Sequence, residues 1–210
     1  MATRYLDAVD YNLYMKNLSI ILVLLFSVNL YAKVQVKVLK GDVTFNGTKV
    51  TKESDLSMGG SVEVGDKSFL KIFSDVNNSS IVIGPNSKLD IKFEKKKLPF
   101  SLLNGVARWV TEGQGKLKGG IKTRNAIMGV RGTDFMIIAN WKLAETEVIC
   151  FDGQVKIFNR ENRKDTGLIN KGQWGGLGGR FGDSVGKVLD LPERFVEVSK
   201  QMLPMNPSSL

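Results

Sequence analysis

The chain has 210 residues, a formal net charge of +9 and 42% hydrophobic residues, so it is long and apolar enough to bury a core. It contains no histidine and a single cysteine, Cys150. This composition excludes histidine-dependent nucleophiles, intramolecular disulfides and zinc sites built from several thiolates. Carboxylate or Ser–Lys chemistry stays open, but no motif indicates it, and we predict no catalytic residue, no metal and no cofactor.

The N-terminal region predicts export. Residues 15–32 read as a signal peptide, with Lys16 before an apolar run at 18–28 and a cleavage point after Ala32. The run is shorter than the ~20 residues that cross a bilayer, which favours cleavage over an uncleaved anchor and predicts no stable membrane span afterwards. Residues 1–14 fit neither pattern and are interpreted as a mis-start or a disordered leader. We therefore expect a bacterial periplasmic or extracellular protein with no nucleic-acid partner.

From Lys33 onward the sequence predicts short strands. Apolar and polar residues alternate in runs, and turn residues such as Asn46-Gly47 and Asp152-Gly153 separate the runs. About a dozen such runs at 8–12-residue spacing are typical of an all-β domain. We expect a single domain, either a sandwich or roll or a solenoid-like stack, over residues 33–174.

The last 36 residues have a different character. Residues 175–179, Gly-Gly-Leu-Gly-Gly, are interpreted as a flexible linker. One short helix is expected at about 192–203, ended by Pro204, with Phe195, Val198 and Met202 on one face. This tail, residues 175–210, either docks on the β domain or awaits a partner.

One segment, residues 121–135 (IKTRNAIMGVRGTDF), resembles the hallmark of the FecR-domain family. Its surroundings agree with that family in order and spacing, at residues 41–43, 83–87, 103–106, 146–155 and 171–174. The resemblance implies an all-β extracytoplasmic domain. Signalling members of the family relay the ligand state of an outer-membrane transporter to a cytoplasmic sigma factor. Here seventeen residues precede the apolar run and no transporter-docking domain is evident after Trp174, so we do not carry that role over.

The hallmark turn consists of Gly129, Val130, Arg131, Gly132, Thr133 and Asp134. Its two glycines suit a sharp turn with positive φ or close backbone approach. Arg131 then projects from a tight turn, where its planar fork can bind carbonyls or the carboxylate of Asp134. We interpret Arg131 as a buried fastener of neighbouring turns; the alternative is a ligand contact.

Three further features have two readings each. Lys95, Lys96 and Lys97 form a basic hairpin tip, either a solvated loop or a contact for an anionic envelope polymer. The three tryptophans pack in the core and at its rim, or form a carbohydrate-stacking surface. Cys150 alternates with Val148 and is predicted to be a small core residue, rather than a reactive thiol.

Two functions remain. The first is a non-catalytic exported module that acts in ligand binding, scaffolding or signalling at the cell envelope, with an envelope protein or an anionic polymer as partner. The alternative is an envelope enzyme that uses carboxylates on a polysaccharide. A cleft with two convergent carboxylates, one of raised pKa, would favour the enzyme; a cleft lined by lysine, arginine and tryptophan would favour binding.

Overall fold

Short strands dominate the computed structural model, which describes residues 33–93, 100–112, 119–130 and 132–205. The expected leader and signal peptide, residues 1–14 and 15–32, lie outside the described residues. Within the described ranges, none of the helices combines the length and the apolar character that crossing a bilayer requires.

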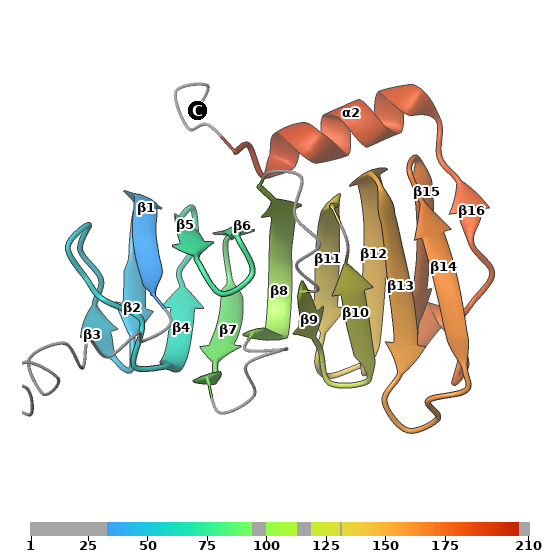
Figure 1. Cartoon of the computed structure of the whole chain (residues 1–210), viewed down its shortest axis with the longest axis horizontal. Coiled ribbons are helices and arrows are strands. Elements are labelled where there is room, and N and C mark those ends of the chain that lie inside the picture. The colour runs from blue at the N-terminus through green and yellow to red at the C-terminus, as the bar shows by residue number, and fades with distance from the viewer. Residues whose placement is uncertain (1–32, 94–99, 113–118, 131, 206–210) are drawn as a thin grey trace, which may run out of the picture. The chain divides into compact units, whose positions relative to one another are not determined.

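Two sheets face each other (Figure 1). The first, sheet A, contains in spatial order β1 (Val34–Lys40), β5 (Phe69–Ser74), β6 (Ser79–Ile83), β8 (Phe100–Thr111), β11 (Asp134–Asn140), β12 (Glu145–Asp152), β15 (Gln173–Leu177) and β16 (Leu189–Asp190). Sheet B contains β3 (Thr48–Lys49), β2 (Val43–Phe45), β4 (Gly60–Val64), β7 (Ser87–Ile91), the first half of β8, β9 (Gly119–Lys122), β10 (Ala126–Val130), β13 (Gln154–Asn159) and β14 (Thr166–Asn170).

Strand β8 belongs to both sheets. Its first residues pair with β7 and β9 in sheet B, and from Gly105 onward it pairs with β11 and then β6 in sheet A. Gly105 has φ +93°, and a Cβ built there would lie 2.1 Å from the hydroxyl of Ser87. Glycine is therefore required at the point where the strand changes sheets.

The core fills the space between the sheets. The fully buried Trp109 packs edge-on against Phe100, with ring centroids 5.7 Å apart, and also contacts Phe135. Cys150 is buried in the same cluster, as predicted. The all-β prediction is confirmed, and of the expected architectures the structure is a sandwich.

The glycine-rich segment is strand, not linker. Gly175, Gly176 and Leu177 lie in β15, which pairs with β12 and β16. A Cβ on Gly176 would lie 2.3 Å from the carbonyl oxygen of Thr146. The linker interpretation was wrong because these glycines permit close approach between packed segments. The short 3₁₀ helix η2 (Gly179–Phe181) follows.

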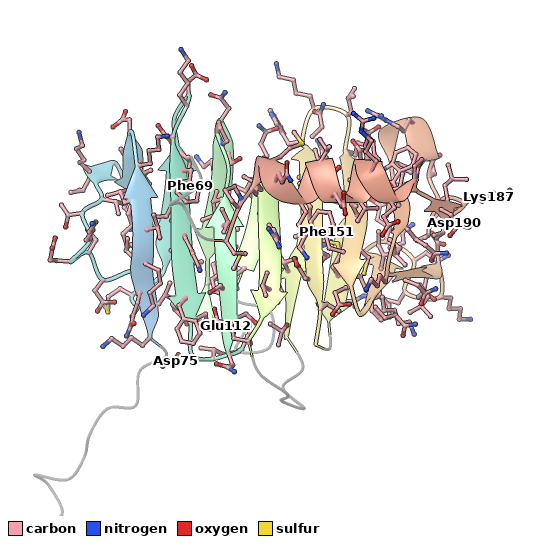
Figure 2. All side chains as sticks on the ribbon, turned by 90° about the horizontal axis from the view of Figure 1, so that it is seen from above. Phe69, Asp75, Glu112, Phe151, Lys187 and Asp190 are labelled. Carbon is pink, nitrogen blue, oxygen red and sulfur yellow. The ribbon has the colours of Figure 1, made fainter. Side chains whose placement is uncertain are left out.

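Helix α2 (Glu193–Met202) leads from β16 back toward β8 and packs on the outer face of sheet A (Figures 1 and 2). A second apolar cluster, which includes Phe151, lies between the helix and the sheet (Figure 2). Docking uses Val196, Ser199 and Leu203, which also share a face. The apolar face noted in the sequence, Phe195, Val198 and Met202, is exposed and does not make this contact.

Candidate functional site

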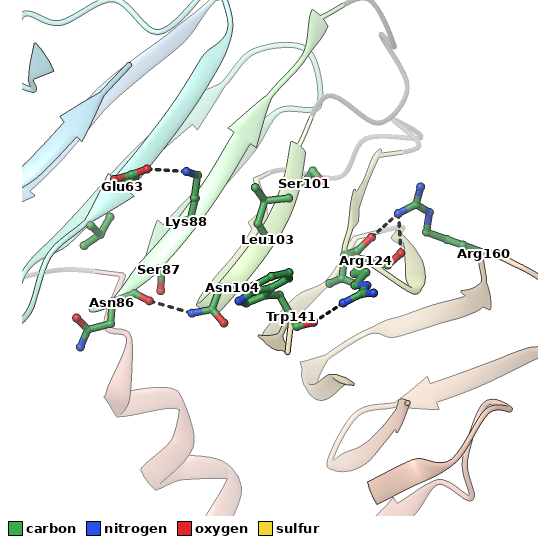
Figure 3. Close-up of a pocket in the computed structure, with 12 residues that line it drawn as sticks. Glu63, Asn86, Ser87, Lys88, Ser101, Leu103, Asn104, Arg124, Trp141 and Arg160 are labelled. Carbon is green, nitrogen blue, oxygen red and sulfur yellow. Dashed lines mark hydrogen bonds and ion pairs between the residues drawn. The ribbon is translucent and has the colours of Figure 1, made fainter. Parts of the chain in front are cut away.

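A groove of about 710 Å³ lies on the outer face of sheet B (Figure 3), whereas α2 packs on sheet A. Its volume is within the ~300–1,000 Å³ that small-molecule sites usually have. Exposed polar and basic side chains alternate with the core residues of the same strands. The lining consists of Glu63, Val64, Asn86, Ser87, Lys88, Ser101, Leu103, Asn104, Thr123, Arg124, Trp141 and Arg160, and is called the Trp141 groove below.

The divergence of two strands opens the groove. The parallel strands β8 and β9 pair at two positions, Phe100 with Ile121 and Ser101 with Lys122. Beyond them β8 crosses toward sheet A, while the chain after β9 turns back into β10. Leu103 is left on one bank of the groove and Arg124 on the other.

Trp141 reaches into this space from the turn between β11 and β12, and 55% of its surface is exposed. The Arg124 guanidinium lies over its ring, 5.9 Å from the centroid, and donates from Nη1 to the Trp141 carbonyl oxygen at 2.8 Å. This cation–π contact and the hydrogen bond fix the indole beside a positive charge.

Arg160, which follows β13, supports the same bank. Its Nη1 donates to the carbonyl oxygens of Thr123 (2.9 Å) and Arg124 (2.7 Å). Among the described residues, no carboxylate lies within ion-pair distance of the guanidinium of Arg124 or Arg160. Both positive charges therefore face the groove without a described counter-ion.

A buried polar network holds the turn that carries Arg124. The hydroxyls of Thr123 and Thr146 lie 2.6 Å apart, and Thr146 donates to Asn125 Oδ1 at 2.6 Å. Asn125 Nδ2 donates in turn to the carbonyl oxygens of Ala144 and Leu177. Because buried hydroxyl and amide groups are costly to leave unpaired, this network fixes the turn between β9 and β10.

An ion pair closes the far end of the groove. Lys88 Nζ and Glu63 Oε1 are 2.6 Å apart, and both side chains are largely exposed. The hydrogen bond to Glu63 and its negative charge raise the pKa of Lys88. Among the described residues, the groove thus has three cations and one carboxylate, and the carboxylate is bound to a lysine.

The structure describes the hallmark turn except for Arg131. Gly132 has a positive φ, +61°, as one of the two expected conformations. Gly129 is an ordinary strand residue of β10 with neither positive φ nor close backbone approach, so the expectation was wrong for that glycine. Thr133 is buried, and Asp134 begins β11. Val130 ends β10. Arg131 and the basic tip Lys95, Lys96 and Lys97 lie outside the described residues, so their roles stay predictions.

A different arginine, Arg108 of β8, holds Asp134. Its side chain is 6% exposed and donates from Nε and Nη2 to both carboxylate oxygens, at 2.8 and 2.7 Å. Its Nη1 donates to the carbonyl oxygens of Lys200 and Leu203, at 3.0 and 2.9 Å. These carbonyls lie at the end of α2, where helical hydrogen bonds run out. Arg108 thereby fastens the helix to sheet A.

A carboxylate pair is present, but outside the groove. Glu145 and Glu147 of β12 both lie within 4 Å of the Arg180 guanidinium, at 3.3 and 3.6 Å. Burial raises the pKa of Glu147, the Arg180 charge and the hydrogen bond from Trp174 lower it, and Glu145 raises it further. Neither glutamate lines the Trp141 groove or one of the smaller described cavities.

The three tryptophans do not form one stacking surface. Trp109 is in the core, and Trp174 packs against Phe181 on the side of the sandwich that carries α2. Only Trp141 faces the groove. Burial raises the pKa of Cys150 to about 12, so its thiol is protonated at neutral pH and is not a reactive group.

The comparisons with known proteins agree with this fold. Residues 60–156 match the family model described as FecR protein, so the chain contains a FecR-type domain. Two crystal structures, at 1.65 and 2.50 Å resolution, of "a putative anti-sigma factor" from Parabacteroides distasonis ATCC 8503 have TM-scores of 0.52 and 0.53 at 13% identity. The alignments cover 67% and 68% of this chain but 64% and 65% of those chains. No curated protein matches.

Sequence reasoning missed most of the groove. Arg124 lies inside the hallmark segment, four residues after Gly120, but nothing in its neighbours marks it as a surface cation. Arg160 and Lys88 come from distant strands, and only the topology brings them to one face. Arg108 had a signal: a charged residue stands between Ala107 and Trp109 in the apolar stretch from Val106 to Val110.

Proposed function

We propose that this chain is an exported, non-catalytic FecR-type module of the bacterial envelope, and that its partner molecule binds in the Trp141 groove. One observation carries the proposal: the groove presents an exposed indole among three cations, and its single carboxylate is engaged by Lys88. Such a site can hold a molecule by stacking and charge, and its described lining contains one carboxylate where hydrolysis of a glycosidic bond needs a convergent acid–base pair.

The family match supports a place in signalling at the envelope, where FecR-like proteins act. In that setting the molecule held in the groove would be the signal or the scaffold to which the domain attaches. The net charge of +9 adds a general attraction for anionic envelope polymers.

The alternative, an envelope enzyme, rests on Glu145 and Glu147. The raised pKa of Glu147 is the kind of perturbation that marks a general acid. However, Arg180 contacts both carboxylates, and Trp174 donates to Glu147 at 3.1 Å. These contacts favour a structural latch between β12 and η2.

The test is a retention and turnover assay with the purified exported protein and isolated envelopes of the bacterium that encodes it. We expect the wild type to sediment with the envelopes and to release no soluble sugar or peptide, and we expect Trp141→Ala to stay in the supernatant. Release of soluble fragments that is lost in Glu147→Gln would instead establish the enzyme.

A further inference from the structure

We propose that the Trp141 groove binds a polysaccharide of carboxylated pyranose residues, a uronic-acid polymer. This inference rests on the proposed binding function and names the ligand class of the same site. It follows from three properties of the groove: a stacking surface, a polar floor and cations along its banks.

The indole of Trp141 supplies the stacking surface. More than half of its surface is exposed, and the Arg124 guanidinium holds it in place. A pyranose ring has a flat face of C–H groups and a rim of hydroxyls, and the flat face packs well on an aromatic ring. A sugar on this ring would have its substituents next to Arg124.

The floor of the groove fits a polyhydroxylated ligand. Asn86, Ser101 and Asn104 present amide and hydroxyl groups beside Leu103. The hydroxyls of Ser87 and Thr123 are buried and hydrogen-bonded within the protein. An extended peptide would require a free strand edge for pairing, but β4 and β7 are paired on both sides.

The cations select a negative charge on the sugar. Lys88 lies at one end of the groove, and Arg124 and Arg160 lie at the other (Figure 3). Guanidinium groups bind carboxylates in a planar, two-pronged geometry. A polymer with one carboxylate on each ring would present charges to both ends while one ring stacks on Trp141.

Isothermal titration of the full exported chain with three probes tests the ligand class. The probes are a galacturonic acid oligomer, the same oligomer fully methyl-esterified, and inorganic tripolyphosphate. We expect the acidic oligomer to bind at least tenfold more tightly than its ester, because the ester has the same rings without the charges. Tripolyphosphate, which has charge without a ring, should bind more weakly than the acidic oligomer.

Three variants tie the binding to the groove. Lys88→Gln should weaken binding of the acidic oligomer several-fold, whereas Lys187→Gln, the same charge change at an exposed position outside the groove, should leave it unchanged. Glu63→Gln should strengthen binding because it removes the one negative charge in the groove. Trp141→Ala should reduce binding of both the acid and the ester.

Equal affinity for acid and ester would overturn the carboxylate assignment and leave a groove for neutral glycans. Tighter binding of tripolyphosphate would show an anion site without sugar recognition. No binding of any probe, with envelope retention still dependent on Trp141, would overturn this inference and leave the proposed function intact. If no probe binds and envelope retention does not depend on Trp141 either, both this inference and the proposed function are wrong.

Discussion

The guanidinium of Arg108 binds both oxygens of the Asp134 carboxylate while it caps the last carbonyls of helix α2. Asp134 belongs to the hallmark segment, and Lys200 of the helix also approaches it, at 3.4 Å. The hallmark therefore connects the sandwich to its C-terminal helix. Gly84 contributes to the same contact, since a Cβ there would lie 2.9 Å from Leu203.

Arg108→Ala should strongly destabilise the protein. The substitution leaves a mostly buried carboxylate with one exposed lysine as partner, and it frees two helix-end carbonyls. Breaking a buried ion pair from one side costs about 3–5 kcal/mol of unfolding free energy. Urea unfolding followed by circular dichroism measures the loss. Arg194→Ala, an exposed arginine of the same helix, is the control and should change little.

The sequence predicted the all-β fold and the helix because alternation, turn residues and Pro204 act locally. It did not predict which face of the helix docks, since Phe195 and Val196 are both apolar and the choice depends on the surface of sheet A. The sequence did not predict the groove either, because Lys88, Arg124 and Arg160 line one groove only through the way the strands pair in the fold.

The two hallmark glycines should respond differently to alanine. Gly132→Ala places a side chain at φ +61° in open space, so it should cost about 1–2 kcal/mol from backbone strain alone. Gly129→Ala should be close to neutral, because a Cβ there makes only ordinary contacts, 3.5 Å from Phe158. Gly105→Ala combines strain with a clash against Ser87 and should cost the most. Thermal melts of the three variants give the ranking, and a Gly129→Ala variant less stable than Gly105→Ala would contradict it.

Glu147 should make stability fall as pH rises. Its pKa is raised in the folded protein, chiefly by burial, so the folded state holds this proton more tightly than the unfolded state. The unfolding free energy then decreases as pH rises from the ordinary carboxyl value through the raised one.

Glu147→Gln removes this titration and can still accept the hydrogen bond from Trp174. The variant should match or exceed the wild type in melting temperature at pH 7, and should lose that advantage below the ordinary pKa of a glutamate. Glu53→Gln, an exposed position, serves as the control. A variant that is less stable than the wild type at pH 7 and equal to it at acidic pH would reverse the assigned sign.

The indole N–H signals of the three tryptophans offer the most direct test of the binding groove. They report separately on the core (Trp109), the α2 side of the sandwich (Trp174) and the groove (Trp141). In ¹⁵N-correlated NMR spectra, assigned with a Trp141→Phe variant, the galacturonic acid oligomer should shift the Trp141 signal and leave those of Trp109 and Trp174 in place. A bound oligomer that moves the Trp174 signal and leaves Trp141 unchanged would place the binding site elsewhere and contradict the account.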